Sequence, residues 1–423
     1  TWGADGAPVR PEGTLAYPVV SWKCPRTVPV AKKFSEQVSP WHVFEVTGYQ
    51  VMSINTLFKL IWLREHAPKS LEEGNIWLMM PALVANRLGA KPHVEPTSAS
   101  TTMAMSVPER DWSDEMLGYA GLDHTFFPPW VEPGEVVGEV SARASRQTGL
   151  KPGTPIVAGG HDTQFAIIGA GAKMDEAVLS SGTWEILAFR CDSFTPTRAG
   201  FDGGVMVEAD VERGMWNPQI LMMGSGVLEW IRSAFFGSSV DYSDMIASAQ
   251  RVPPGSRGVC VLPSFVSDSG PNRRFGTMGT ILGLGLNTSR DEIYRAALEG
   301  LSFQLRQSLE ILTESTGIRP TGIRVVGGGS RNELWNRIRA DTTGLPVTIT
   351  SITEATVLGA SLVAFRGIGR FRSLEAAVRS IDFGETTIRP GEHGETYEEL
   401  YRQYLKVPPS LAGYYRDLKL GRD

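Results

Sequence analysis

The sequence predicts an α/β protein with two or three domains. The chain has 423 residues, and domains commonly hold roughly 150 residues each. Hydrophobic residues make up 42% of the chain and charged residues 21%, a globular composition that excludes collagen, coiled coil and wholesale disorder. The last third alternates strand-like and helix-like segments around a glycine-rich loop, which is typical of a mainly parallel sheet with crossover helices.

Charge and cysteine content exclude several classes of protein. The formal net charge is -5, and we find no basic run, so nonspecific binding to nucleic acid or to a membrane surface is not expected. The three cysteines, Cys24, Cys191 and Cys260, are far apart and form no CxxC pair, so neither a zinc site nor a disulfide framework is indicated. Free thiols fit a cytoplasmic location, and no apolar run approaches the ~20 residues of a membrane helix.

The first third is predicted to contain few long elements. Residues 1–6 read as the end of a strand running into a turn, and the chain begins without Met, so we expect its natural start to lie upstream. Residues 13–22 read as a strand, residues 54–66 as an amphipathic helix, and residues 71–88 as mainly helix. Residues 92–133 are rich in Pro, Ser and Thr and are expected to form a surface loop or a cleft wall.

Regular elements become clearer after residue 150. A short buried strand at 154–158 runs into Gly159-Gly160-His161-Asp162-Thr163, and residues 177–190 alternate as a hairpin with its turn at Gly182-Thr183. We place a domain boundary near residue 172.

The last third supplies the α/β units. A strand is predicted at 279–286, and Ser289 with Glu292 forms a capping box that begins a long helix. Further strands are predicted at 323–326 and 346–350, and further helices at 332–343 and 354–365.

Two glycine-containing turns are candidate phosphate sites. Residues 327–332, Gly-Gly-Gly-Ser-Arg-Asn, match neither the dinucleotide fingerprint nor a P-loop, so they indicate either a nucleotide site or a tight strand–helix turn. Residues 180–184, Ser-Ser-Gly-Thr-Trp, could bind phosphate through main-chain N–H groups and hydroxyls, or form an ordinary hairpin turn.

Carboxylates supply the candidate catalytic chemistry. Asp162 follows a buried strand and two glycines, where it could accept a proton from a substrate hydroxyl or cap a helix. Asp5 grouped with Trp22, Lys23 and Arg26 would suit a polyol, or form a surface ion pair. The sequence contains no GxSxG and no HExxH, so a hydrolase serine and a metal site are not indicated.

Five motifs stand in a fixed order along the chain. They are Thr1-Trp2-Gly3-Ala4-Asp5-Gly6, Ser21-Trp22-Lys23-Cys24-Pro25-Arg26-Thr27, Gly160-His161-Asp162-Thr163-Gln164-Phe165-Ala166, Ser181-Gly182-Thr183-Trp184-Glu185 and Gly327-Gly328-Gly329-Ser330-Arg331-Asn332. In this order the chain resembles the FGGY carbohydrate kinases from Thr1 to about residue 369. The resemblance is strongest to the branch that acts on L-fuculose, followed by the branch that acts on L-rhamnulose.

The resemblance implies a two-lobed actin/hexokinase-like fold, each lobe built on an RNase H-like core. Residues 1–172 would form the sugar-binding lobe, and residues 173–423 the nucleotide-binding lobe. The implied reaction is ATP-dependent phosphorylation of a ketose at O1, with L-fuculose as the expected sugar and L-rhamnulose or another pentulose or hexulose as alternatives. The implied partners are a small-molecule sugar and ATP, which would bring its own Mg²⁺. No metal-ligating residue of the chain is implied. A homodimer is left open.

The same resemblance assigns roles to individual residues. Asp162 would be the catalytic base on the sugar hydroxyl. The sugar would contact Gly3, Asp5, Trp22, Arg26, His161 and Thr163. ATP would contact Gly182, Thr183, Ser225, Glu229, Gly328 and Asn332. Ser225 lies within the string Gly224-Ser225-Gly226, which departs from the commoner family pattern, and Glu229 follows it.

The sequence does not contain the Asp-x-Gly phosphate loop that opens the first lobe in this family. The first lobe is therefore expected to lack its opening strands. Because that loop should contact the ATP phosphates or their Mg²⁺, we expect weak or no turnover. A non-catalytic sugar- or nucleotide-binding pseudokinase is the alternative from another class. An actin-like assembly protein is a third, which Asp5 and Trp22 argue against.

Overall fold

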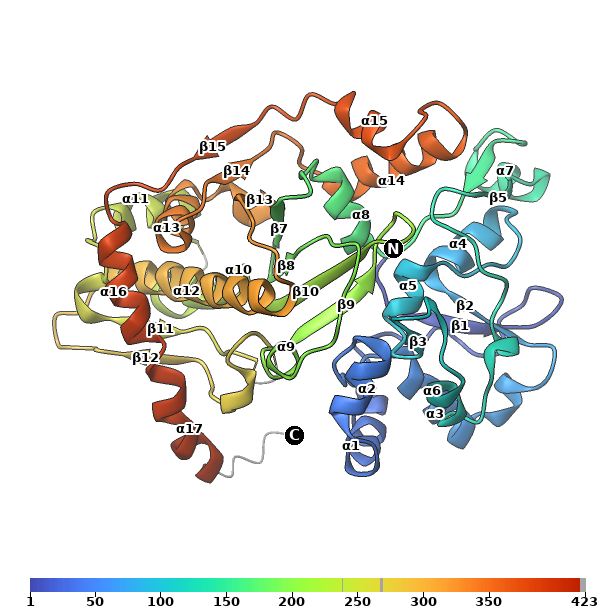
Figure 1. Ribbon diagram of the computed structural model, residues 1–423, viewed down its shortest axis with the longest axis horizontal. Helices are drawn as coiled ribbons and strands as arrows, with labels where there is room; N and C mark the ends of the chain where they lie inside the picture. Colours follow the sequence, from blue (N-terminus) through green and yellow to red (C-terminus); the bar gives the residue numbers. More distant parts are fainter. Residues whose placement is uncertain (238, 267–268, 419–423) are drawn as a thin grey trace.

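A computed structural model describes residues 1–237, 239–266 and 269–418, which form two lobes of mixed helix and sheet (Figure 1). Helix α8 (Asp162–Gly169) follows the strands of the first lobe and packs against the second lobe, whose sheet has β7 (Glu176–Ser181) as its first strand along the chain. The start of the chain lies between the lobes, beside α5 (Pro96–Ser100) and α8 (Figure 1). Among the described residues, no helix is long and apolar enough to cross a membrane.

The first lobe combines short strands with helices. Its remaining elements are β1 (Gly6–Val9), α1 (Val28–Gln37), α2 (Pro40–Thr47), α3 (Thr56–His66), β2 (Ile76–Met79), α4 (Met80–Leu88), β3 (Met105–Ser106), β4 (Asp111–Trp112), α6 (Asp114–Gly118), β5 (Val136–Glu139), α7 (Ala142–Thr148) and β6 (Pro155–Val157). The strands pair antiparallel as β1 with β2, β3 with β4 and β5 with β6. The helix predicted at 54–66 and the strand predicted at 154–158 are confirmed by α3 and β6.

Three sequence predictions in this lobe are wrong. Residues 76–79 form a strand rather than part of a helix, because they pair with β1 and bury Trp77 and Leu78 completely, while Pro81 marks the start of α4. Residues 13–22 turn back on β1 through a single bridge, Val9 to Leu15, and do not continue as a strand. A strand was expected to end before residue 6, yet β1 begins there.

The segment 92–133 is not a flexible surface loop. Met103, Ala104 and Met105 are buried in the largest apolar core, and Thr101 lies against Gly3. This segment therefore forms a packed wall beside the start of the chain, as the second of the two expectations proposed.

The second lobe is built on a seven-stranded sheet in the order β15-β14-β13-β7-β8-β10-β9. Its further elements are β8 (Trp184–Ala188), α9 (Arg198–Asp202), β9 (Val205–Ala209), β10 (Trp216–Met223), α10 (Ser225–Ile231), α11 (Tyr242–Gln250), β11 (Cys260–Leu262), β12 (Thr280–Leu282), α12 (Arg290–Thr316), β13 (Gly322–Val326), α13 (Glu333–Thr343), β14 (Val347–Ile349), α14 (Ala355–Gly367), α15 (Leu374–Arg379), β15 (Thr386–Ile388), α16 (Gly394–Tyr404) and α17 (Val407–Asp417).

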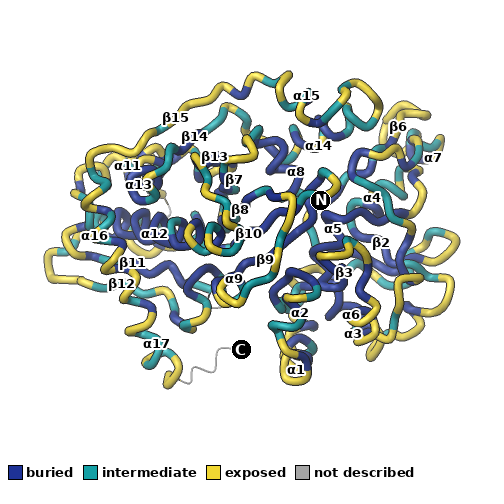
Figure 2. The backbone as a smooth tube through the Cα atoms, viewed as in Figure 1, coloured by how far each residue is buried: buried dark blue, intermediate teal, exposed yellow. Residues whose placement is uncertain are grey.

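The sheet is mixed rather than mainly parallel. Only β7, β13 and β14 run parallel, while β8, β9, β10 and β15 pair antiparallel with their neighbours. The difference arises because β7 and β8 are joined by the short turn Gly182-Thr183, and such a turn reverses the chain direction. The predicted hairpin, the Ser289–Glu292 capping box and the long helix α12 are confirmed. Figure 2 shows α12 as largely buried.

Two close contacts position the start of α8. A Cβ on Gly169 would lie 1.8 Å from the carbonyl oxygen of Ala355, and a Cβ on Gly359 would lie 1.9 Å from that of Phe165. Because only glycine allows this approach, α8 packs backbone to backbone against α14. The N-terminal residue of α8, Asp162, is thereby held at a defined place relative to the second lobe.

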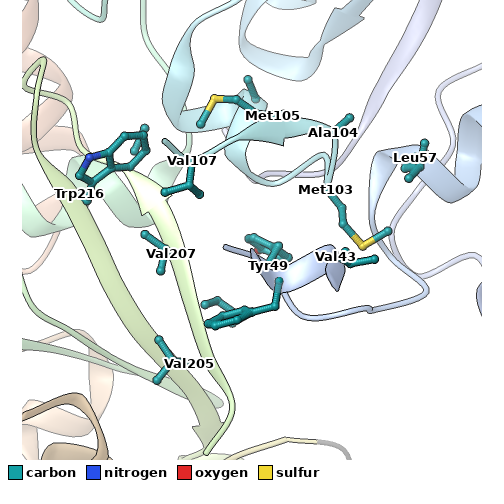
Figure 3. Close-up of a cluster of buried hydrophobic side chains, with 14 of the residues drawn as sticks. Val43, Tyr49, Leu57, Met103, Ala104, Met105, Val107, Val205, Val207 and Trp216 are labelled. Atoms are coloured by element: carbon teal, nitrogen blue, oxygen red, sulfur yellow. The ribbon is translucent and has the colours of Figure 1, made fainter. Parts of the chain in front are cut away.

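Strand β9, at the edge of the second-lobe sheet, packs against the first lobe. Its Val205 and Val207 face Tyr49 and Val107 of the first lobe in a shared apolar cluster (Figure 3). The amide of Val207 also donates a 2.8 Å hydrogen bond to the carbonyl of Gly48. Since successive side chains of a strand point to opposite faces, Glu208 lies on the face of β9 opposite to Val205 and Val207.

Candidate active site

Asp162 is the first residue of α8, directly after the loop that follows β6. Its amide donates a 2.8 Å hydrogen bond to the carbonyl of Thr1, and its side chain is 42% exposed. The helix cap is His161, so the carboxylate of Asp162 does not take the capping position that was the alternative interpretation. An exposed carboxylate at a helix N-terminus, where the helix dipole favours negative charge, is available to a ligand hydroxyl.

Gly3 and His161 lie against one another beside Asp162. A Cβ on Gly3 would lie 3.1 Å from His161 Nε2 and 2.7 Å from Thr101 Cγ2, so only glycine fits there. His161 Nε2 is 3.4 Å from Asp162 Oδ1. Thr163 is half-buried in the first turn of the same helix. The structure therefore brings together four of the predicted site residues: Gly3, His161, Asp162 and Thr163.

The imidazole of His161 is held from its other side by Glu208 of β9. His161 Nδ1 lies 2.7 Å from Glu208 Oε2. Burial lowers the pKa of His161, but the Glu208 carboxylate, aided by Asp162, outweighs burial and raises it above its usual range. Glu208 was not predicted from the sequence, although a glutamate inside the apolar strand Val205–Ala209 is an unusual feature that could have drawn attention to it.

Asp5 does not pair with Trp22, Lys23 or Arg26, which corrects that sequence prediction. The Asp5 side chain is 1% exposed, lies 2.5 Å from Lys59 Nζ and accepts a 2.6 Å hydrogen bond from Trp2 Nε1. Because the buried ammonium group of Lys59 and the indole N–H of Trp2 occupy the carboxylate, the structure gives Asp5 a structural role in the first lobe.

Arg26 and Trp22 contact residues other than Asp5. Arg26 lies 4.6 Å from the ring centroid of Trp62, donates to Tyr17 Oη at 3.2 Å, and lines a pocket between α1 and α3. Trp22 is an exposed ring with the Lys23 ammonium 5.3 Å from its centroid. Within the described parts of the chain, neither Arg26 nor Trp22 has a hydrogen bond, ion pair or ring contact with the group around Asp162, so the geometry brings neither to that group.

A second group of residues meets at the carboxyl ends of β7 and β13. Ser225, the first residue of α10, donates from its hydroxyl to the carbonyl of Gly182 at 2.8 Å. A Cβ on Gly327, which has φ +88°, would lie 2.6 Å from the carbonyl oxygen of Ser181. Thr183, Gly327 and Gly328 are exposed. Exposed backbone N–H groups and hydroxyls gathered at such a sheet edge suit a polyphosphate.

A buried ion pair supports this second group. Arg339 of α13 and Glu185 of β8 are both fully buried and bonded to each other, and both also bond Ser181 Oγ. Burial raises the pKa of Glu185 and lowers that of Arg339, each opposed by the other's charge. The pair joins β7, β8 and α13 directly beneath the turn at Gly182.

The last two predicted nucleotide residues are already bonded within the protein. Asn332 caps α13 by accepting from the Trp335 amide at 3.0 Å, and it donates to Tyr294 Oη at 3.2 Å. Glu229 is exposed on α10 and bonds Arg232 at 2.8 Å and Tyr242 at 2.6 Å. Asn332 therefore shapes the start of α13, and Glu229 lies on the surface beyond Ser225.

Both halves of the chain match models of one enzyme family. Residues 2–169 match the N-terminal domain of the FGGY family of carbohydrate kinases, and residues 177–368 match its C-terminal domain. The chain belongs to the FGGY family of carbohydrate kinases. It is thus a carbohydrate kinase with the two-lobed actin/hexokinase-like fold that the sequence motifs predicted, and members of this family use ATP as a substrate.

Sequence relatives include several sugar kinases. L-fuculokinase of Escherichia coli (strain K12) is 37% identical over 95% of this chain and 83% of that protein. L-fuculokinase of Haemophilus influenzae is 34% identical over 92% and 82% of the two chains. Autoinducer-2 kinase of Escherichia coli (strain K12) is 29% identical over 97% and 78%.

Solved structures share the fold of this FGGY kinase. Xylulose kinase from Rhodospirillum rubrum has a TM-score of 0.86 at 21% identity, covering 97% of this chain and 83% of that chain. Gluconate kinase from Lactobacillus acidophilus has a TM-score of 0.89 at 19% identity, covering 99% and 84%. Plasmodium falciparum glycerol kinase with ADP has a TM-score of 0.84 at 20% identity, covering 96% and 81%.

Proposed function

We propose that this FGGY kinase transfers the γ-phosphoryl group of ATP to O1 of a ketose, with L-fuculose as its substrate. The observation that carries the proposal is the exposed Asp162 carboxylate at the start of α8, with His161 and Gly3 beside it. The choice of L-fuculose is supported by the relatives named L-fuculokinase, at 34% to 37% identity. Autoinducer-2, named by relatives at 29% identity, is the substrate to be tested against it.

In the proposed reaction Asp162 is the general base. The ketose O1 attacks the γ-phosphorus, its proton passes to the Asp162 carboxylate, and the bond from the γ-phosphorus to the bridging oxygen breaks, so that ADP leaves with that electron pair. A carboxylate of reference pKa about 3.9 is a weak base toward an alcohol. It suffices because the loose transition state of phosphoryl transfer requires proton removal only late.

We assign the sugar to the group of residues around Asp162 and ATP to the group at the carboxyl ends of β7 and β13. Gly3, His161 and Thr163 would contact the sugar beside Asp162. Gly182 and Thr183 would contact the phosphates, Ser225 and Glu229 would lie beside the nucleotide, and Gly328 with Asn332 would lie at its adenosine end. Residues 1–172 would then be the sugar-binding lobe and residues 173–423 the nucleotide-binding lobe, although residues 419–423 lie outside the described residues.

Mg²⁺ fits this arrangement as a companion of the nucleotide. Among the described residues, no group of three or more His, Cys, Asp or Glu side chains is arranged to hold a metal ion. Mg²⁺ commonly binds through substrate phosphates and water, so it needs no protein cage and would neutralise charge on the phosphate oxygens. The homodimer and the cytoplasmic location, which the free thiols of Cys24, Cys191 and Cys260 would suit, stay predictions.

A coupled assay of ADP release tests the proposed function. L-fuculose, L-rhamnulose, xylulose, ribulose and autoinducer-2 are compared at saturating MgATP. We expect the highest kcat/KM with L-fuculose. A higher value with another sugar would replace the substrate assignment, while calorimetric binding of sugar and ATP with no turnover of any sugar would favour the pseudokinase alternative.

A further inference from the structure

Glu208 is a buried carboxylate that accepts hydrogen bonds from three donors. His161 Nδ1 lies at 2.7 Å, Gln164 Nε2 at 2.6 Å and Tyr49 Oη at 3.1 Å, and the Glu208 side chain is 1% exposed. The donors come from the loop before α8, from α8 itself and from the segment after α2, so residues of both lobes meet at this carboxylate. Gln164 is held in turn by Asn217 of β10. The carboxylate is therefore fixed on several sides.

This contact fixes the orientation of the His161 ring. With Nδ1–H donating to Glu208, only Nε2 can face Asp162, whose Oδ1 lies 3.4 Å away. Gly3 leaves room for the ring, since a Cβ there would lie 3.1 Å from Nε2. An imidazole placed between two carboxylates can donate to both of them only when it is protonated.

We propose that Glu208 is a positioning residue of the phosphoryl-transfer site, holding His161 as an imidazolium whose Nε2–H is turned toward the acceptor oxygen beside Asp162. The proposal rests on the proposed function, because it assigns the sugar hydroxyl to this place. The ketose oxygen gains negative charge as its proton moves to Asp162. A fixed cation at hydrogen-bond range stabilises that charge without reorganisation during the reaction.

The charges around His161 support the protonated form. Glu208 faces the ring from β9, and Asp162 faces it from α8. Tyr49 bonds the far oxygen of Glu208, and Glu95 bonds Thr97, whose hydroxyl accepts from the His161 amide. Burial lowers the pKa of His161, and Glu208 with Asp162 raises it overall, in agreement with the geometry.

An NMR titration tests the positioning directly. The Cε1–H signals of the six histidines are followed against pH, and His161→Asn identifies the signal of His161. We expect Glu208→Gln to move the His161 midpoint to lower pH, because it removes the adjacent negative charge. Glu212→Gln is the matched control, since Glu212 is a partly exposed partner of Arg190 on the same lobe and should leave the midpoint unchanged. An unchanged midpoint in Glu208→Gln overturns the proposal.

Steady-state kinetics supply the second measurement. Glu208→Gln should lower kcat by roughly tenfold or more with little change in the KM for ATP, and the fall in kcat at high pH should begin at lower pH. If Glu208→Gln does not fold, as judged by circular dichroism, Glu208→Asp replaces it. The shorter aspartate retains the negative charge but places it farther from His161. It should lower both kcat and the midpoint, and wild-type values of both contradict the proposal.

The two proposals can fail separately. If no sugar is phosphorylated, the proposed function fails, while the NMR titration still tests whether Glu208 holds His161. If Asp162→Asn abolishes turnover of L-fuculose but Glu208→Gln has a normal kcat and pH profile, the proposed function stands and the positioning role of Glu208 is overturned.

Discussion

Arg339 and Glu185 form an ion pair beneath the turn that joins β7 and β8, and neither side chain is exposed to solvent. Both side chains also bond Ser181 Oγ, and a Cβ on Gly329 would lie 2.0 Å from that same oxygen. One hydroxyl thus connects the buried pair to the glycine-rich loop. The exposed backbone proposed to hold the ATP phosphates is therefore shaped from below by charges that the ligand never touches.

Replacing Arg339 with Met should destabilise the protein strongly. The change leaves the Glu185 carboxylate buried without its cation, and breaking a buried pair from one side costs about 3–5 kcal/mol. Urea unfolding measures the free energy of unfolding. Arg379→Met is the control, because the pair of Arg379 with Glu375 is exposed and should contribute little.

The double variant Glu185→Gln with Arg339→Met separates charge from packing. It removes both charges, so it should be more stable than Arg339→Met alone. Equal stability of the single and double variants would contradict the explanation by unpaired charge.

Asp162→Asn should lower kcat by a factor of about 10² to 10⁴ while changing the KM for sugar only modestly. The amide retains the size of the carboxyl group but cannot accept the hydroxyl proton. Asp202→Asn, an exposed residue at the end of α9, is the control and should behave as wild type. A normal kcat in Asp162→Asn would remove Asp162 from the role of base.

Local patterns predicted most of the second lobe. The Ser289–Glu292 capping box and the hairpin around Gly182 rely on contacts between residues close in sequence, so their signals survive in the sequence alone. The mixed sheet was missed because the predicted hairpin of β7 and β8 joins the parallel strands through the pairing of β7 with β13, and that pairing between distant segments is not encoded in either of them. Strand β2 was missed for the same reason, since its partner β1 lies about 70 residues earlier.

In the candidate site, too, the residues within local motifs were predicted, and partners supplied only by contacts distant in sequence were not. Gly3, His161 and Asp162 were predicted from motifs, and the fold brings them together. Asp5 and Arg26 were grouped by chemistry, yet Lys59 of α3 takes the carboxylate, and a buried lysine needs such a partner. Glu208 lies 46 residues beyond Asp162, and only the crossing of β9 between the lobes brings it to His161.

Neighbouring glycines of the loop after β13 should respond differently to a methyl group. A Cβ on Gly329 would lie 2.0 Å from Ser181 Oγ, so Gly329→Ala should disturb the turn and lower the free energy of unfolding. Apart from its chain neighbours, no heavy atom of the described residues lies within 4 Å of a Cβ on Gly328. Gly328→Ala should therefore fold normally but raise the KM for ATP, because its methyl group would occupy the open space proposed for the nucleotide. Unfolding and calorimetric nucleotide binding distinguish the two effects, and unaltered ATP binding in Gly328→Ala would argue against this loop as part of the nucleotide site.

Stability should decrease with rising pH in a way that His161 explains. Glu208 and Asp162 raise the pKa of His161 in the folded state above 6.5, whereas the unfolded chain keeps the ordinary value. Below pH 6.5 both states are protonated, and the stabilisation from the charged ring is fully present. As the pH rises further, the unfolded state loses the proton first, so this stabilisation decreases and is gone once the folded pKa is passed. Urea unfolding of wild type and His161→Asn between pH 6 and 9 measures it. The difference in free energy of unfolding between the two proteins should shrink toward high pH, and a difference that stays constant would mean that His161 is not protonated in the folded protein.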